Sequence, residues 1–308
     1  MTIFNVAVAM GCPLLGAVGV LDGAYAGAVP DRTNATATTA GVLRPEELAR
    51  HVELAREPVS GRVGAWVENH WALRWVLPEG RVVRSEVLPH PTASLTVELG
   101  THPRPELPPG ESVVVTGVCT PRFDVEVRGR GLVLGVRFRP GGLAALTGRT
   151  ASGWVDRSVP ARGLLPDRLV EQLADPGLVA EPAAWRAAAE TGLTALDPGE
   201  DPRYDLLLRV VRDMLEDHTL VTVAEVARRH GRSVRTLQRL FLHYVGVGPK
   251  WVLVRYRMHD VVTAVDEGFA GSLTELAHRF GWYDQAHLTR DFVALLGTTP
   301  GRYRDRRP

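Results

Sequence analysis

The segment Thr222–Pro249 reads TVAEVARRHGRSVRTLQRLFLHYVGVGP, and a related segment follows from Ser272 as SLTELAHRFGWYDQAHLTRDFVALLGTTP. Matching residues in the first halves of the two segments are 50 positions apart, whereas those in the second halves are 51 apart. One residue has therefore been added between the halves of the second copy. Self-similarity at a fixed spacing indicates repeated copies of one supersecondary unit.

Each copy predicts a short helix, a tight turn and a second helix. In the first copy Thr222 is followed three residues later by Glu225, which is the capping-box pattern at a helix start. Gly231 stands where a left-handed residue ends that helix, Ser233 can cap the next helix, and Gly246 ends it. The corresponding residues of the second copy are Ser272, Glu275, Gly281, Asp284 and Gly297. Two helices joined through a glycine-containing turn form the helix-turn-helix motif.

The second helix of each copy carries polar residues that its packing does not require. In the first copy Leu237, Leu240 and Phe241 share one side and are expected to be buried. In a helix-turn-helix motif this helix lies in the major groove of DNA, where arginine pairs with guanine and glutamine with adenine. The residues predicted to contact bases are Arg235, Gln238 and Arg239 in the first copy and Gln285, His287 and Arg290 in the second.

Residues at the helix starts can hold DNA phosphates and so fix the register of the protein on the duplex. We predict this role for Thr222, Arg232 and Ser233. Asp284 and Asp291 lie near the second reading face, and because carboxylates repel phosphate this unit is expected to bind more weakly or mainly to fix position. The alternative for Asp284 is a helix cap. The alternative for the whole region is a helical bundle with solvated arginines, which two capped copies at one spacing disfavour.

The residues from Pro249 to about Glu267 predict one long amphipathic helix between the two units. At 1.5 Å per residue it would span ~27 Å, so two reading helices could enter successive major grooves roughly 34 Å apart. Residues 203–308 contain 17 Lys and Arg against 12 Asp and Glu, whereas the preceding residues contain 19 against 23. The excess of positive charge near the repeat favours a polyanion as partner.

The part before the repeat predicts strands and then helices. From about residue 64 to 138, short runs rich in Val, Leu and Trp are separated by turns that contain Pro and Gly. This pattern favours a β-barrel or sandwich. We expect a β-rich domain at 44–155, a helical linker at 156–202 and an all-α DNA-binding domain at 203–308. Residues 1–43 are expected to be a disordered or dispensable leader. An export signal is disfavoured, because such signals begin with basic residues and none precedes Arg32. The apolar run is too weak for a membrane span, and two distant cysteines suit a reducing cytoplasm.

Several motifs in residues 203–304 resemble the DNA-binding domain of the AraC/XylS family of bacterial transcription regulators. They are SVRTLQRLF, VGPKWVLVRYRMHD, LAHRFGWYDQAHLTRDF and GTTPGRYR, in that order. The resemblance implies the same base-reading positions as above and adds Thr236 and Ala286 as flanking candidates. It also implies double-stranded promoter DNA as partner and RNA polymerase as a further partner.

The N-terminal part resembles a cupin-like domain of unknown role that precedes this type of DNA-binding domain, through HWALRWVLPEG, EVLPHPTASLTVE and GRGLVLGVRFRPGGLAAL. In the wider family such domains bind a small effector, form homodimers, or both. The residues that could form an effector pocket are Trp66, Trp71, Trp75, His90 and Arg137. Core packing is the alternative for the tryptophans, of which two would share one face of a continuous strand. We expect no metal and no cofactor, because the histidines (His70, His90 and His102) lack the spacing of a metal-binding cupin.

The sequence therefore predicts a cytoplasmic, sequence-specific DNA-binding transcription regulator whose N-terminal domain binds a small effector. The alternative is a DNA-binding regulator whose N-terminal domain only dimerises or binds a protein partner. An enzyme is not expected, since the nucleophile elbow, the P-loop, the HExxH motif and the dinucleotide-binding fingerprint are all missing from the sequence.

Overall fold

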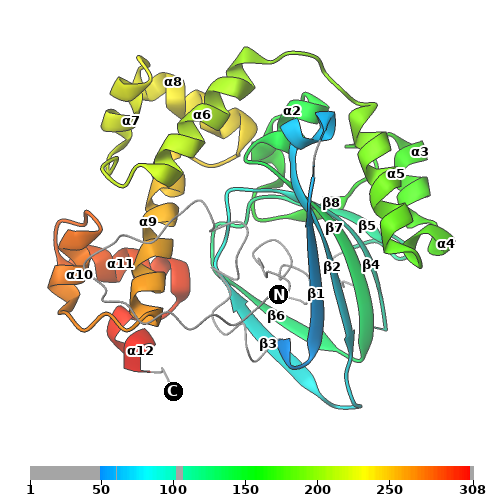
Figure 1. Cartoon of the computed structure of the whole chain (residues 1–308), viewed down its shortest axis with the longest axis horizontal. Helices are drawn as coiled ribbons and strands as arrows, with labels where there is room; N and C mark the ends of the chain where they lie inside the picture. The colour runs from blue at the N-terminus through cyan, green and yellow to red at the C-terminus, as the bar shows by residue number, and fades with distance from the viewer. Residues whose placement is uncertain (1–48, 60, 102–106, 306–308) are drawn as a thin grey trace, which may run out of the picture.

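The computed structural model describes residues 49–59, 61–101 and 107–305 (Figure 1). The predicted leader, residues 1–43, and His102 lie outside the described residues. Strands dominate up to residue 160 and helices dominate from residue 167 onward. The expected order, a β-rich domain followed by an all-helical region, is therefore confirmed. Within the described ranges, no helix combines the length and the apolar character that crossing a bilayer requires.

The β-rich domain contains a six-stranded antiparallel sheet. In spatial order its strands are β1 (Val52–Pro58), β2 (Val67–Val76), β7 (Arg130–Phe138), β4 (Ser94–Gly100), β5 (Val113–Thr116) and β8 (Ser158–Pro160). Two further strands, β3 (Val82–Val87) and β6 (Phe123–Arg128), pair with each other. Since β8 pairs with β5, the sheet continues beyond residue 155, into the segment expected to be a helical linker.

Two tryptophans of β2 lie over two glycines of β7. Trp71 pairs with Gly135 and Trp75 pairs with Gly131. A Cβ atom on either glycine would overlap the indole ring opposite it, so only glycine leaves room for these side chains. Directly paired residues point to the same side of a sheet, and the expected single face for Trp71 and Trp75 is therefore confirmed. Both indoles are buried.

The opposite face of the sheet is covered by helices. Buried Leu95, Leu134 and Val136 on this face belong to one core with Trp185 of α5 (Pro182–Thr194). The indole nitrogen of Trp185 donates to the carbonyl oxygen of Leu173 over 3.1 Å, which anchors α5 to its neighbour. The other helices that precede the repeat are α2 (Gly142–Thr147), α3 (Asp167–Ala174) and α4 (Pro176–Val179), with 3₁₀ helices η3 (Arg62–Ala65) and η4 (Ala151–Trp154). Helices α3, α4 and α5 lie together beside the sheet in Figure 1.

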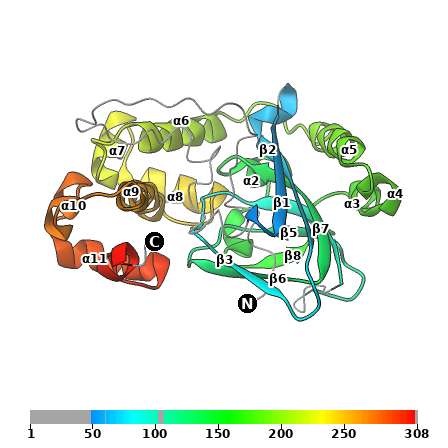
Figure 2. The same cartoon turned by 60° about the horizontal axis from the view of Figure 1, so that its bottom comes forward.

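The helical region contains the two predicted units with one long helix between them. Its helices are α6 (Pro202–Glu216), α7 (Val223–Arg229), α8 (Val234–Tyr244), α9 (Pro249–Asp266), α10 (Leu273–Arg279), α11 (Gln285–Leu296) and α12 (Pro300–Asp305). Helices α7 and α8 form the first unit, and α10 and α11 the second. Figures 1 and 2 both show α9 running between the two units.

The connecting helix α9 is more buried than the sequence suggested. Thirteen of its 18 residues are buried, among them the charged or polar residues Arg255, Arg257, His259 and Asp260. The amphipathic pattern expected for this helix is wrong, because α9 packs on several sides rather than one. Arg257, for example, donates from Nε to the carbonyl oxygen of Phe280 over 2.8 Å and lies over the ring of Trp282.

The first unit shares its hydrophobic core with the β-rich domain, whereas most of the second unit's core is its own. One buried cluster runs from the sheet through α6 and α8, and a second cluster joins α9, α10 and α11 with Leu88. At the junction, a Cβ atom on Gly141 would meet the side chains of Leu207 and Tyr244. The hydroxyl of Tyr204 also donates to the carbonyl oxygen of Ala65. The first reading helix is therefore held directly against the N-terminal domain.

Candidate nucleic-acid interface

Both units begin with the predicted capping box. The hydroxyl of Thr222 accepts from the backbone amide of Glu225 over 3.2 Å, and the Glu225 carboxylate accepts from the Thr222 amide over 2.8 Å. Ser272 and Glu275 make the same reciprocal pair at 3.1 and 2.7 Å. The hydrogen bond from the Ser272 amide lowers the pKa of the Glu275 carboxyl. These bonds satisfy amides that a helix start leaves unpaired.

The turns also follow the predicted pattern. Gly231 and Gly281 have φ values of 58° and 77°, a left-handed conformation that glycine adopts without strain. Ser233 accepts the Thr236 amide over 3.1 Å, which caps α8. Asp284 accepts the His287 amide over 2.7 Å, which caps α11. The cap role considered for Asp284 is thus present.

The first reading face is exposed and unpaired. Leu237, Leu240 and Phe241 are buried, as predicted, while the opposite side of α8 faces solvent. Within the described part of the chain, its polar side chains make no hydrogen bond or ion pair with protein; they are Arg235, Gln238 and Arg239. Thr236 is exposed and its hydroxyl lies 2.9 Å from that of Ser233. This face is free to bind an external partner.

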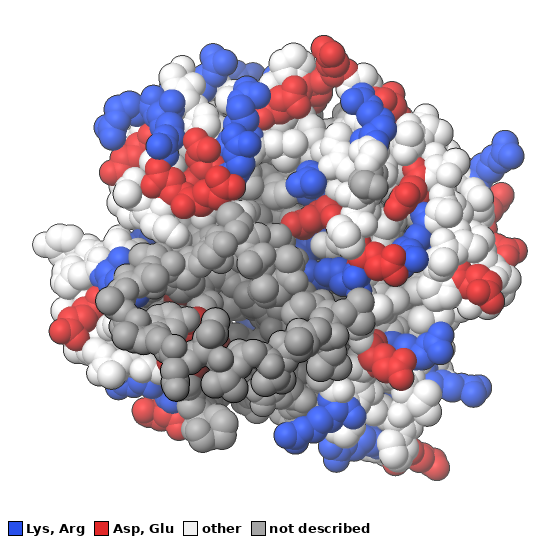
Figure 3. All heavy atoms as spheres, viewed as in Figure 1, with Lys and Arg blue, Asp and Glu red and all other residues white. Residues whose placement is uncertain are grey.

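A hollow of about 350 Å³ lies at the start of α8 beside α6. Arg232, Thr236 and Arg239 line it together with Arg203, so three arginines surround one depression. In Figure 3 basic side chains gather at the upper left, over α6, α7 and α8, with acidic side chains next to them. Some of the neighbouring basic charge is paired, since Arg229 forms an ion pair with Asp217. Positive charge beside a reading helix suits a phosphate backbone.

The second reading face carries less free positive charge. Gln285, Ala286 and Arg290 are exposed, whereas His287 is half-buried. Nε2 of His287 lies 3.5 Å from Oδ2 of Asp291, and the amide oxygen of Gln285 accepts from Thr274 over 3.3 Å. Arg290 is therefore the cation that this face offers to DNA, since it has no protein partner in the described part of the chain.

Sequence reasoning missed Tyr283, which is 84% exposed and stands just before the cap of α11. An exposed aromatic side chain at the start of a reading helix is a further candidate for contact with DNA. The signal was present in the repeat, because the added residue of the second copy falls between Gly281 and Asp284.

The predicted effector residues separate into two groups. Trp71, Trp75 and Arg137 point to the same side of the sheet, as their register shows, and His90 lies close to Arg137. Trp66 is apart from them. It ends η3, its ring lies under Arg62 at 5.0 Å, and it belongs to the core on the other side.

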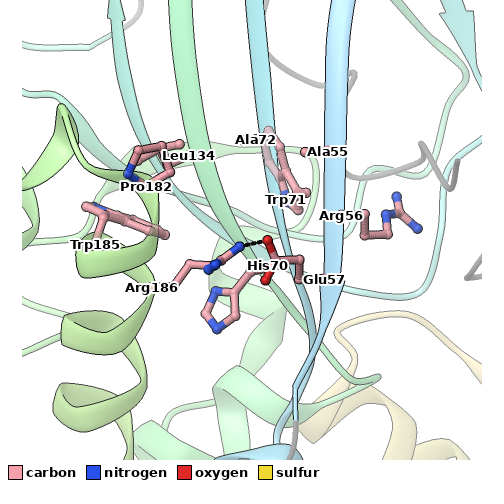
Figure 4. Close-up of a pocket in the computed structure, with 10 residues that line it drawn as sticks. All are labelled: Ala55, Arg56, Glu57, His70, Trp71, Ala72, Leu134, Pro182, Trp185 and Arg186. Atoms are coloured by element: carbon pink, nitrogen blue, oxygen red, sulfur yellow. Dashed lines mark ion pairs between the residues drawn. The ribbon is translucent and has the colours of Figure 1, made fainter. Parts of the chain in front are cut away.

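A small pocket of about 20 Å³ lies on the helix-covered side, between β1, β2 and α5 (Figure 4). Of the five predicted residues, only Trp71 lines it. An ion pair between Glu57 and Arg186 crosses it, and His70 lies 3.0 Å from Glu190 at its edge. Burial lowers the pKa of His70, against the opposing effect of Glu190. The pocket is therefore distinct from the face that carries Arg137.

Comparisons with known proteins match both halves of the chain. A family model described as a helix-turn-helix domain matches residues 226–306, and one described as a domain of unknown function (DUF6597) matches residues 59–160. AraC-like transcription regulators of Streptomyces antibioticus and Streptomyces lividans are 37% and 36% identical to it over 83 residues. These matches cover 27% of this chain and 27% of each relative.

Among solved structures, ToxT from Vibrio cholerae is 10% identical, with 82% of this chain and 97% of that chain covered and a TM-score of 0.35. Unsaturated fatty acid bound ToxT is likewise 10% identical, with 82% and 94% covered and a TM-score of 0.34. The sequence relatives are named as regulators rather than enzymes. The C-terminal part of the chain is therefore a helix-turn-helix domain with two capped units that is similar to AraC-like transcription regulators, and residues 59–160 match the DUF6597 family model.

Proposed function

We propose that this protein is a sequence-specific DNA-binding transcription regulator in which α8 and α11 enter the major groove. The observation that carries the proposal is the first reading face. Arg235, Gln238 and Arg239 project from a capped helix and have no protein partner in the described part of the chain. Arginine and glutamine in this position can pair bidentately with guanine and adenine.

The other predicted contacts follow from the same placement. Thr236 and Ala286 flank the reading residues, and Gln285, His287 and Arg290 would read the second groove segment. Thr222, Arg232 and Ser233 would hold phosphates, since all three are exposed, Thr222 at the start of α7 and the other two in the turn before α8. The paired state of His287 and Gln285 suits weaker base reading by the second unit than by the first.

We further propose that the β-rich domain biases DNA binding through a small effector. Its support is the shared core, because a ligand that shifts the sheet would act on α6 and α8 directly. We also propose that the protein acts in the cytoplasm and contacts RNA polymerase. The second candidate is a β-rich domain that only dimerises or binds a protein, for which the position of β1 at the edge of the sheet, unpaired on one side within the described residues, is the supporting feature.

The test is selection of bound duplexes from a random pool by the full chain. The full chain is required because the first unit shares its core with the N-terminal domain. Enrichment of a defined site supports a regulator that reads sequence. Salt-sensitive binding to all duplexes without enrichment would contradict it. A molar mass measurement on the same sample separates a homodimer from a monomer.

A further inference from the structure

Four basic side chains meet where the sheet contacts the connecting helix α9. Arg137 comes from β7, His90 from the chain between β3 and β4, and Arg255 and His259 from one side of α9. All four are buried, with exposed fractions of 0% for Arg137, 1% for His90, 0% for Arg255 and 3% for His259. The rings of His90 and His259 are 4.9 Å apart. The cluster therefore joins the N-terminal domain to the helix that carries both DNA-reading units.

Each of the two arginines contacts the protein through one guanidinium nitrogen, Nε. Nε of Arg255 donates to the carbonyl oxygen of Pro89. Nε of Arg137 donates to the hydroxyl of Thr92 over 3.3 Å and lies 3.3 Å from a carboxylate oxygen of Glu68. Both guanidinium groups are thereby held in place from one side.

The remaining donors are buried and have no protein partner in the described residues. They are both Nη atoms of Arg137, both Nη atoms of Arg255 and the two ring nitrogens of His90. Buried charges in proteins are normally paired, because desolvation of an unpaired guanidinium is strongly unfavourable. Two buried arginines with unused N–H groups thus lie close enough to act electrostatically on each other and on His90.

Among the described residues, basic groups dominate the charge around this place. The groups that act electrostatically on His90 are Arg137, Arg255, His259 and Arg56, which are all basic. Burial, followed by these neighbours, lowers the pKa of His90 well below its ordinary value. Glu68 is the carboxylate that faces Arg137. Within the described residues, this one carboxylate faces two buried arginines.

We propose that this cluster, Arg137, Arg255 and His90, binds the oxyanion group of a small molecule, either a carboxylate or a phosphate. A planar guanidinium presents two parallel N–H groups that match either oxyanion. The bound group would contact the sheet through Arg137 and α9 through Arg255. This inference deepens the effector part of the proposed function by giving the ligand a chemical class and a place.

The test is thermal unfolding of the full chain without DNA, so that failure of this proposal is separable from failure of DNA binding. The probes are sodium phosphate, acetate and benzoate, each compared with chloride at constant ionic strength. A ligand that binds the folded state raises the unfolding temperature in a saturable way. Saturable stabilisation by phosphate alone assigns a phosphate group, and stabilisation by acetate or benzoate alone assigns a carboxylate.

Substitutions locate the effect. Arg255→Met and Arg137→Met should each raise the half-saturating anion concentration at least about tenfold. Arg257→Met is the matched control on the same helix, since this buried arginine already bonds Phe280 and covers Trp282. It should lower stability but keep the anion response. Arg255→Lys, which keeps charge without the fork, serves where a methionine variant does not fold.

Three results would overturn the proposal. One is that phosphate, acetate and benzoate all behave like chloride. Another is that Arg255→Met, Arg255→Lys and Arg137→Met respond to the anion as the unsubstituted chain does. The last is that Arg257→Met loses the response as fully as the two cluster variants, since this would place the effect outside the cluster.

Discussion

The indole nitrogen of Trp282 donates to the carboxylate of Asp291 over 2.8 Å. This bond ties the turn of the second helix-turn-helix unit to the middle of its reading helix. The same carboxylate lies 3.5 Å from the His287 imidazole. The second unit therefore has a carboxylate at the position that Leu240 occupies in the first unit, which makes the surroundings of the two reading helices electrostatically different.

Replacing Asp291 tests this difference. In Asp291→Asn the amide oxygen still accepts from Trp282, so the fold should be kept while one repulsive charge is removed. We expect tighter binding to every duplex and a steeper dependence of affinity on salt. Equilibrium binding at several salt concentrations checks this, with Asp167→Asn on α3 as the control. Unchanged affinity and slope would mean that Asp291 lies away from the phosphates.

Arg239 is expected to read a base. Arg239→Ala should weaken binding to the selected site by ~1–3 kcal/mol and relax the preference at one position. The control is Arg168→Ala, which removes an exposed arginine of the same charge from α3 and should leave affinity unchanged. Competition binding with single-position variants of the site measures both effects. Equal weakening on all sequences would instead make Arg239 a phosphate contact.

Asp217 makes the stability of the first unit depend on acid. Hydrogen bonds from the Thr219 side chain and backbone, with the Arg229 guanidinium, lower the pKa of Asp217 to about 2 from an ordinary 3.8. Because the folded-state pKa is the lower one, the contribution of this carboxylate is complete above about pH 4 and disappears as the pH falls towards 2. Unfolding free energies of the full chain and Asp217→Asn should therefore converge over this range. A constant difference from pH 6 to pH 2 would contradict the assignment.

Gly135 is expected to be required for the packing of Trp71. Gly135→Ala places a methyl group into the indole ring, and overpacking of this kind costs ~1–3 kcal/mol of folding free energy. Gly153→Ala is the control, because a Cβ atom there meets nothing within 4 Å. Urea unfolding of the two variants checks the contrast. Equal stability would show that the sheet relaxes without cost.

The sequence was most informative where structure is decided by near neighbours. The capping boxes at Thr222 and Ser272 and the left-handed glycines depend on residues three to five positions apart, and all formed as expected. The buried side of α8 followed from helical periodicity alone. The shared face of Trp71 and Trp75 followed from strand alternation in the same way.

Relations between distant segments could not be predicted in this way. Arg255 bonds Pro89 across 166 positions of the chain, and no local pattern encodes that meeting. Helix α9 is buried on several sides by such distant segments, whereas charged residues of a helix normally indicate an exposed side. Trp66 was grouped with Trp71 by proximity in sequence, yet its side chain lies in the core on the other side of the sheet.

The most direct test of the account is selection from a random duplex pool by three forms of the full chain: unsubstituted, Arg239→Ala and Arg290→Ala. We predict a site with two blocks about one helical turn, ~10 base pairs, apart. Arg239→Ala should blur a position in one block only, and Arg290→Ala a position in the other. A single block that ignores Arg290→Ala would leave the second unit as a positional clamp. Binding without any enriched sequence would contradict the central claim that this protein reads DNA bases.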